Sequence, residues 1–98
     1  MPIYKSVIYL ATMILRQIPS TSEMIPVIGL GTWQSFDVNP SSDLKPLKKI
    51  LSTMREAGAK LIDSSPMYGK SEEIVGSLTE DDVNNSFFYA TKVWTRGK

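Results

Sequence analysis

Blocks of hydrophobic residues separated by polar turns predict a hairpin followed by a strand near the start of the chain. Residues 13–18 are mostly apolar and β-branched, and a turn cluster follows at 19–23. Met24-Ile25-Pro26 then leads into a strand expected over about 27–32. Because the apolar run at 25–30 is continuous rather than alternating, we expect both faces of that strand to be covered.

Two later segments have the hydrophobic spacing of amphipathic helices. The first is expected to start near Ser41, Ser42 or Asp43, all good N-cap residues, and to end at Gly58, a typical C-terminal glycine. The second is expected to have Ser71 as its N-cap, with carboxylates in its first turn. The side chains expected to be buried against the strands are Ile28, Leu30, Leu51, Met54, Ile62, Val75 and Leu78.

Further strands are expected at about 60–63 and 87–92, so helices alternate with strands along the chain. This order predicts an α/β fold with a parallel sheet and helices packed against it. The 98 residues are enough for one domain at most.

Composition excludes several kinds of chemistry. Eleven basic residues against ten acidic ones give a net charge of +1, which argues against a nucleic-acid partner. The chain has no cysteine and no histidine, so it can build neither a disulfide, a thiolate or histidine metal site, nor a Ser-His-Asp triad. We therefore expect no metal, and any proton chemistry must use Tyr, Lys, Asp or Glu.

The beginning of the chain differs in character from the rest. Its longest apolar stretch, Val7 to Leu15, is far shorter than the ~20 residues that span a membrane, so we expect no membrane partner. The stretch has some features of an export signal but lacks a small-residue cleavage site, and a cytoplasmic location is expected. Residues 1–13 are interpreted as an extra leader, with Met13 as an alternative natural start.

Three residues stand out as candidates for chemistry. Asp63 ends a predicted strand, Tyr68 lies in the loop after it, and Lys92 interrupts a strongly apolar run. Ligands of parallel α/β folds meet the carboxyl ends of the strands, and a buried lysine needs a carboxylate such as Asp63 as its partner. Each residue alone also has an ordinary interpretation: a loop or capping aspartate, a partly buried loop tyrosine, or a solvated edge-strand lysine.

The two glycines of Gly29-Leu30-Gly31-Thr32-Trp33 lie at the end of the first predicted strand. The spacing is not that of a phosphate-binding loop, but glycine lets a flat ring approach the backbone closely.

Four segments together resemble the aldo-keto reductase family. They are Val-Ile-Gly-Leu-Gly-Thr-Trp (27–33), Ala-Gly-Ala-Lys-Leu-Ile-Asp-Ser-Ser-Pro-Met-Tyr-Gly (57–69), Ser-Glu-Glu-Ile-Val-Gly-Ser-Leu (71–78) and Ala-Thr-Lys-Val-Trp (90–94). They occur in the family's order, and the resemblance covers roughly residues 14–98. It implies that residues 14–98 form the N-terminal part of a (β/α)₈ TIM barrel, with a hairpin, about three parallel strands and two helices.

The resemblance also implies a function. Members reduce aldehydes and ketones to alcohols with a nicotinamide cofactor, usually NADPH, so NADP(H) and a small carbonyl substrate are the expected ligands. Asp63, Tyr68 and Lys92 match three of the family's four catalytic residues, with Tyr68 as the proton donor and Lys92 placing positive charge beside it.

Further matches concern the binding of cofactor and substrate. Gly31, Thr32 and Asp63 match cofactor-binding positions, and Trp33 and Trp94 match positions of the substrate pocket. The family's catalytic histidine and the segment that holds the adenosine phosphates have no match in this sequence. Two interpretations therefore stay open: the N-terminal portion of an NADP-dependent reductase, or a truncated product without independent activity.

Overall fold

The computed structural model describes residues 13–82 and 86–97. Within them, β1 (Leu15–Gln17) and β2 (Met24–Pro26) form an antiparallel pair with Arg16 opposite Ile25. The turn between them is closed by hydrogen bonds that include Ile18 N–H to the Glu23 carbonyl, 2.8 Å. The predicted hairpin is confirmed. The expected leader, apart from Met13, lies outside the described residues.

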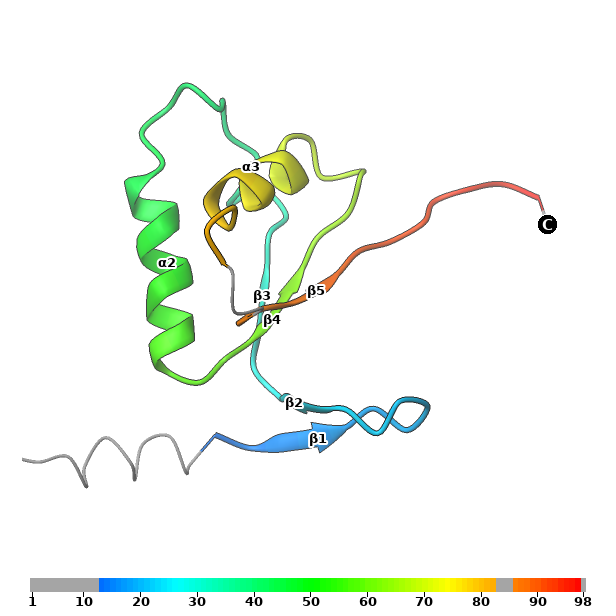
Figure 1. Ribbon diagram of the computed structural model, residues 1–98. Coiled ribbons are helices and arrows are strands. Elements are labelled where there is room, and N and C mark those ends of the chain that lie inside the picture. Colours follow the sequence, from blue (N-terminus) through cyan, green and yellow to red (C-terminus); the bar gives the residue numbers. More distant parts are fainter. Residues whose placement is uncertain (1–12, 83–85, 98) are drawn as a thin grey trace, which may run out of the picture.

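A three-stranded parallel sheet forms the centre of the fold (Figure 1). Its strands are β3 (Gly29–Gly31), β4 (Leu61–Asp63) and β5 (Phe88–Ala90), in the order β3-β4-β5. Gly31, Asp63 and Ala90 share one register row. The three predicted parallel strands are confirmed, although each is shorter than the sequence pattern indicated.

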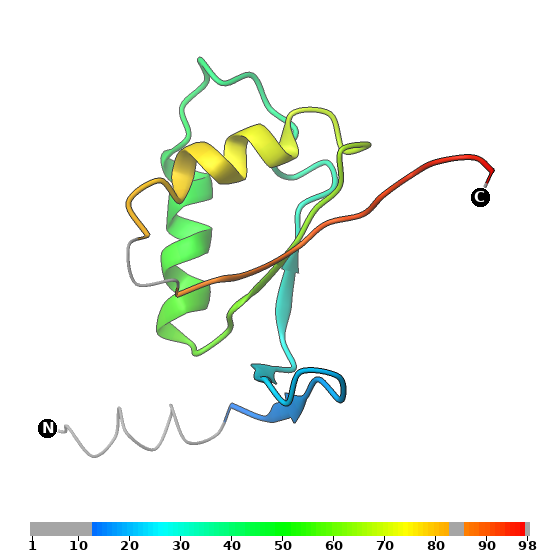
Figure 2. The same ribbon diagram turned by 45° about the vertical axis from the view of Figure 1, so that its right-hand side comes forward.

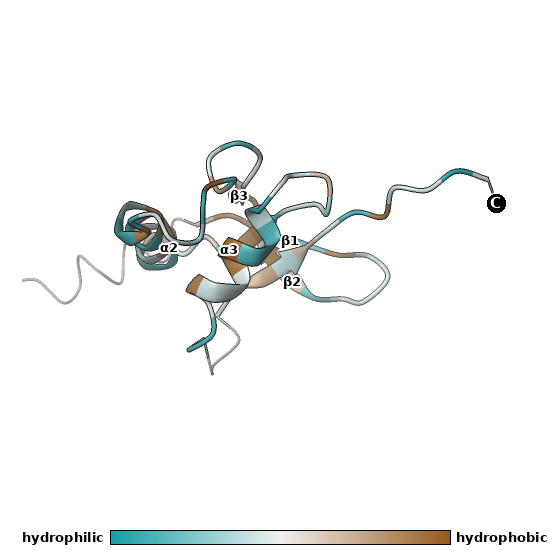
Figure 3. Ribbon diagram, turned by 90° about the horizontal axis from the view of Figure 1, so that it is seen from above, coloured by the Kyte–Doolittle hydropathy of each residue, from teal (hydrophilic) through white to brown (hydrophobic). Residues whose placement is uncertain are grey.

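The helix between β3 and β4 is α2 (Lys45–Glu56). It begins after the expected N-cap residues, because its N-cap is Leu44 and no side chain caps it. Asp43 nevertheless accepts a hydrogen bond from the Lys45 N–H at 3.1 Å. The predicted end is confirmed, since Gly58 follows with φ = 85°, a left-handed conformation that favours glycine. Seen end-on in Figure 3, α2 carries both hydrophobic and hydrophilic residues.

The helix between β4 and β5 is α3 (Ser71–Leu78). Its N-cap is Lys70, so the expectation that Ser71 caps the helix is wrong. Ser71 is instead the first helical residue, and its hydroxyl is used elsewhere in the fold. The expected carboxylates of the first turn are present as Glu72 and Glu73.

One hydrophobic core joins both helices to one face of the sheet. Its buried members are Phe36, Leu51, Ile62, Ile74, Val75 and Phe87. The prediction of a buried position is confirmed for Leu51, Ile62 and Val75, while Leu30, Met54 and Leu78 pack against the core partly buried. Phe36, which lies in the loop after β3, was not expected there.

The expectation that the first parallel strand is covered on both faces is wrong. Ile28, expected to be buried, is 58% exposed, and Val27 before it is 47% exposed. Both helices contribute to the core on the Ile62 side, and side chains alternate along a strand, so Asp63 and its neighbour Gly31 lie toward the opposite face. That face meets solvent.

After β5 the chain leaves the body of the molecule as an extended tail (Figures 1 and 2). Val93 and Trp94 on this tail are 89% and 78% exposed. Across residues 13–82 and 86–97, no helix has the length and hydrophobicity needed to span a membrane.

Candidate active site

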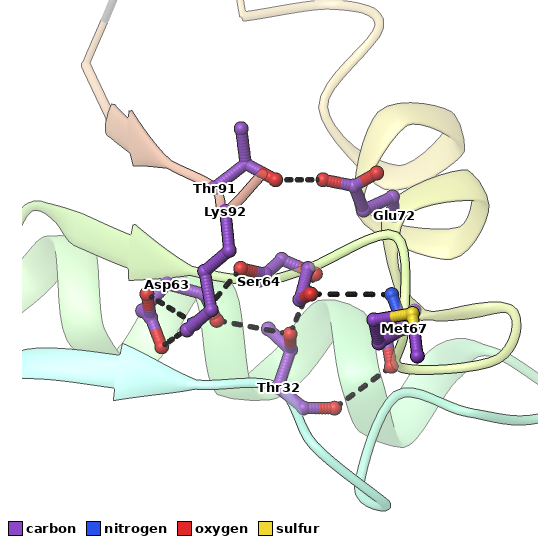
Figure 4. A network of polar contacts seen from close by, with 9 residues as sticks. Thr32, Asp63, Ser64, Met67, Glu72, Thr91 and Lys92 are labelled. Carbon is purple, nitrogen blue, oxygen red and sulfur yellow. Dashed lines mark hydrogen bonds and ion pairs between the residues drawn. The ribbon is translucent and has the colours of Figure 1, made fainter. Parts of the chain in front are cut away.

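An ion pair joins the carboxyl ends of β4 and β5 (Figure 4). Lys92 lies two residues beyond the end of β5, and its Nζ is 2.9 Å from each carboxylate oxygen of Asp63, the last residue of β4. Nζ also donates to the Ser64 carbonyl at 3.0 Å. Three acceptor atoms thus fix the ammonium beside the strand ends.

Tyr68 lies next to this ion pair. The Lys92 Nζ is 4.7 Å from the centroid of the Tyr68 ring, within the range of a cation–π interaction. The three residues singled out from the sequence are therefore brought together, as expected. Trp33, on the loop after β3, also lies beside Tyr68, with ring centroids 6.4 Å apart.

The electrostatics of the cluster favour the charged lysine. The pKa of Lys92 is raised above 10.5, chiefly by its hydrogen bonds to the Asp63 carboxylate and further by the neighbouring Tyr68. Lys92 is therefore a cation at neutral pH. Its side chain and that of Asp63 are 44% and 42% exposed, so water screens the pair and its stabilising effect on the fold is small.

The loop that carries Tyr68 is held by backbone hydrogen bonds at both ends. The Tyr68 N–H donates to the Ser65 carbonyl, and the Tyr68 carbonyl accepts from the Ser71 N–H, both at 3.0 Å. Gly69 follows with φ = 57°. A Cβ at Gly69 would overlap the carboxylate of Asp37, which accepts the Lys70 N–H at 2.8 Å. The positive φ therefore favours glycine at this position, and a Cβ there would in addition require the Asp37 carboxylate to shift.

Gly31 and Thr32, at the end of β3, match cofactor-binding positions but differ in their surroundings. A Cβ at Gly31 would meet no atom within 4 Å, so the space beside it is open. Thr32 is fully buried. Its hydroxyl shares hydrogen bonds with the Asp63 carbonyl and the Ser64 hydroxyl, its N–H donates to the Asp63 carbonyl, and its carbonyl accepts from Ser71 and Phe36. Thr32 thus links the end of β3 to the end of β4 through buried hydrogen bonds.

The two tryptophans that match substrate-pocket positions are both exposed, Trp33 at 64% and Trp94 at 78%. Neither is buried between a helix and the sheet. Trp33 stands beside Tyr68, whereas Trp94 lies on the extended tail.

No role was expected for the hydroxyl groups of Ser64 and Ser65, and only the role of a helix cap was expected for Ser71. These three serines are 5%, 2% and 0% exposed, and each takes part in a hydrogen bond near the strand ends. The signal that could have found them is the pair Ser64-Ser65 directly after a strand-ending aspartate, because small hydroxyl residues there can satisfy backbone groups of tight loops.

A separate cavity of about 430 Å³ lies between α3 and β5, on the helix side of the sheet. Glu72 and Thr91 line it and are hydrogen-bonded to each other (Figure 4), whereas Asp63, Tyr68 and Lys92 do not line it. This cavity is distinct from the candidate site. In the part of the chain that the structure describes, no acidic cluster of three or more residues could hold a metal ion.

Comparison with known proteins assigns the chain to a class of enzymes. A model of the Aldo/keto reductase family matches residues 27–98. A D-galacturonate reductase of Hypocrea jecorina is 34% identical over 74 residues, and the aldehyde reductase YPR1 of Saccharomyces cerevisiae is 30% identical over 76 residues. These alignments cover 71% and 76% of this chain but 22% of each relative.

Solved structures give the same result. An aldo-keto reductase of Pseudomonas aeruginosa matches with a TM-score of 0.69 at 29% identity, over 86% of this chain and 34% of that one. The aldo-keto reductase AKR2E5, solved with NADPH, matches with a TM-score of 0.61 at 25% identity, over 85% of this chain and 27% of that one. The chain belongs to the aldo/keto reductase family of oxidoreductases. It spans about a fifth of the length of the curated relatives it matches.

Proposed function

We propose that this chain carries the proton-donating part of the active site of an NAD(P)H-dependent reductase that converts aldehydes or ketones to alcohols. The observation that supports it most is the position of the Lys92 ammonium, 2.9 Å from the Asp63 carboxylate and 4.7 Å from the Tyr68 ring centroid. No other arrangement of titratable groups at the described strand ends combines a phenol with a fixed positive charge.

The described residues fit the nicotinamide end of such a cofactor. The space beside Gly31 is open, and Gly31 shares a register row with Asp63 on the face of the sheet away from the helices. A flat ring lying against Gly31 would therefore sit beside the Asp63–Lys92 pair. Thr32 would shape this place through its backbone and its bonds to Asp63 and Ser64.

When bound, a reduced nicotinamide supplies a hydride to the carbonyl carbon of the substrate. Tyr68 then gives its hydroxyl proton to the carbonyl oxygen, so that the product is a neutral alcohol. Lys92 stabilises the phenolate that remains, because a positive charge nearby favours the charged form of an acid. Asp63 holds the ammonium in place, and Trp33 beside Tyr68 would line the substrate side.

The same proposal includes the architecture of the whole protein. We take the three parallel strands and two helices as the first part of a (β/α)₈ barrel, whose interior face is the one on which Asp63 and Gly31 lie. A barrel of this kind has about 250 residues, and its active site lies at the carboxyl ends of the strands, where this cluster is.

A second candidate is a product without independent activity. It is favoured by the solvent exposure of the face that bears the cluster, since water competes there with every polar contact of a bound cofactor or substrate. We expect residues 1–98 alone, mixed with NADPH and a reactive aldehyde, to cause no loss of reduced cofactor. Turnover that disappears in the Tyr68→Phe variant would show instead that this chain is a complete catalyst.

The assigned roles are tested in a complete barrel. Residues 27–98 replace the matched segment of a full-length relative such as the yeast aldehyde reductase, and carbonyl reduction is assayed with and without the Tyr68 hydroxyl. Loss of reduction with retained cofactor binding supports the proposal.

A further inference from the structure

The hydroxyl of Ser71 has an unusual use for a serine at the start of a helix. Serines in this place commonly cap the helix itself, but Ser71 is the first helical residue of α3 and caps nothing. It is fully buried, and its Oγ donates to the Thr32 carbonyl at 2.9 Å, across 39 positions of sequence. This bond ties the loop before α3 to the end of β3.

Ser71 is also attached directly to Tyr68. Its backbone N–H donates to the Tyr68 carbonyl at 3.0 Å. Any displacement of Ser71 is therefore passed to the Tyr68 backbone. Further attachments of this loop are the Met67 N–H to the Ser65 hydroxyl, the Tyr68 N–H to the Ser65 carbonyl, and the Lys70 N–H to the exposed Asp37 carboxylate.

The residue that receives the Ser71 bond is itself fixed to the ion pair. The Thr32 N–H donates to the Asp63 carbonyl at 3.1 Å and the Thr32 hydroxyl donates to it at 3.0 Å. A short buried path thus runs from Tyr68 through Ser71 and Thr32 to Asp63, the residue that holds Lys92.

We propose that Ser71 is a positioning residue for Tyr68: its hydroxyl, anchored on the Thr32 carbonyl, sets the place of the Tyr68 ring against the Lys92 ammonium. The catalytic meaning of this position rests on the proposed function, but the geometric claim does not. The side chains of Tyr68 and Lys92 are both partly exposed, so water competes with their direct contact. The buried hydrogen bond from Ser71 to the Thr32 carbonyl is better suited to keep the distance between them constant.

Removal of this hydroxyl should leave the fold intact. In Ser71→Ala the Thr32 carbonyl still accepts the Phe36 N–H at 3.2 Å, so it is not left without a partner. Alanine is also well suited to the first turn of a helix. The variant therefore separates positioning from folding.

The test is NMR spectroscopy of the labelled 98-residue chain, with no catalysis involved. The wild type should show NOEs between the Lys92 side-chain methylenes and the Tyr68 ring, and between the Trp33 and Tyr68 rings. Ser71→Ala should lose at least half of both intensities while cross-strand signals of β4 and β5 persist. Ser71→Thr, which keeps a hydroxyl, should retain them, and Ser77→Ala on the exposed part of α3 is the matched control.

Three results would overturn the proposal. They are wild-type NOE intensities in Ser71→Ala, absence of these NOEs from the wild type, and global unfolding of Ser71→Ala, which would make the hydroxyl a requirement of the fold as a whole. Because none of these readouts depends on turnover, the proposed enzymatic function can fail without affecting the result. In an active grafted barrel, the same variant should lower kcat about tenfold and leave the KM for the cofactor nearly unchanged.

Discussion

The Nζ atom of Lys92 lies 2.9 Å from both carboxylate oxygens of Asp63, although the two residues are 29 positions apart in sequence. The parallel sheet explains this proximity, because Asp63 and Ala90 share a register row and Lys92 lies only two residues beyond the end of β5. A bidentate contact of this kind fixes a positive charge at one point, and Tyr68 is the group placed next to it.

The ion pair predicts a specific dependence of stability on pH. The pKa of Lys92 is raised in the folded state, so its stabilising contribution is complete below about 10.5, the value expected for the unfolded chain, and is lost as pH rises through the folded-state pKa. The melting temperature of the wild type should therefore approach that of Lys92→Met as pH rises above about 10.5. A difference between the two proteins that stays constant over this range would contradict the pairing.

The Tyr68 loop should not tolerate a side chain at Gly69. Gly69→Ala must place alanine at φ = 57° and displace the Asp37 carboxylate from the Lys70 N–H. We expect a loss of about 1–3 kcal/mol in the free energy of unfolding, measured by urea denaturation. Gly76→Ala is the control, since this helical glycine has open space around it and the substitution should stabilise α3 by up to about 1 kcal/mol. Equal effects of the two substitutions would contradict this account.

The two glycines of β3 should respond to alanine in opposite ways. A Cβ at Gly29 would lie 2.9 Å from Leu61 Cδ2 and 3.1 Å from the Leu61 carbonyl oxygen, so Gly29→Ala should separate β3 from β4 and destabilise the fold by about 1–3 kcal/mol. A Cβ at Gly31 meets nothing within 4 Å, so Gly31→Ala should change stability by less than about 0.5 kcal/mol.

In a complete barrel these two substitutions should have the opposite order of effect on NADPH affinity, with Gly31→Ala the more damaging. Gly31→Ala places a methyl group in the space proposed for the nicotinamide ring, so it should weaken NADPH binding although it leaves the fold intact. Fluorescence titration with NADPH measures this effect. Unchanged affinity in Gly31→Ala would place the ring elsewhere.

Much of the fold could be predicted because it depends on local patterns. The hairpin, the three parallel strands and the end of α2 at Gly58 each follow from turn residues, apolar runs or a glycine with a positive φ. The closeness of Asp63 and Lys92 followed from the rule that functional side chains gather at the carboxyl ends of parallel strands.

Other features depend on packing that no local pattern contains. Phe36 lies in a loop without periodicity, yet it is fully buried because that loop packs it into the core with Leu51 of α2 and Ile74 of α3. Ile28 belongs to an apolar run, yet it is 58% exposed, because it lines an open apolar hollow beside α2, with Ile50 and Met54, instead of closing against that helix. Ser71 has the sequence signature of a helix cap, but its hydroxyl donates instead to the Thr32 carbonyl, 39 positions away in the sequence.

The kcat of the barrel that carries residues 27–98 tests most directly whether Tyr68 donates a proton to the carbonyl oxygen. Tyr68→Phe removes only the hydroxyl and keeps the ring against Lys92. The account predicts that kcat for aldehyde reduction falls by about 10²–10⁴-fold while the dissociation constant for NADPH stays within about twofold of the unsubstituted graft. A Tyr68→Phe variant that keeps the full kcat of the graft would contradict it.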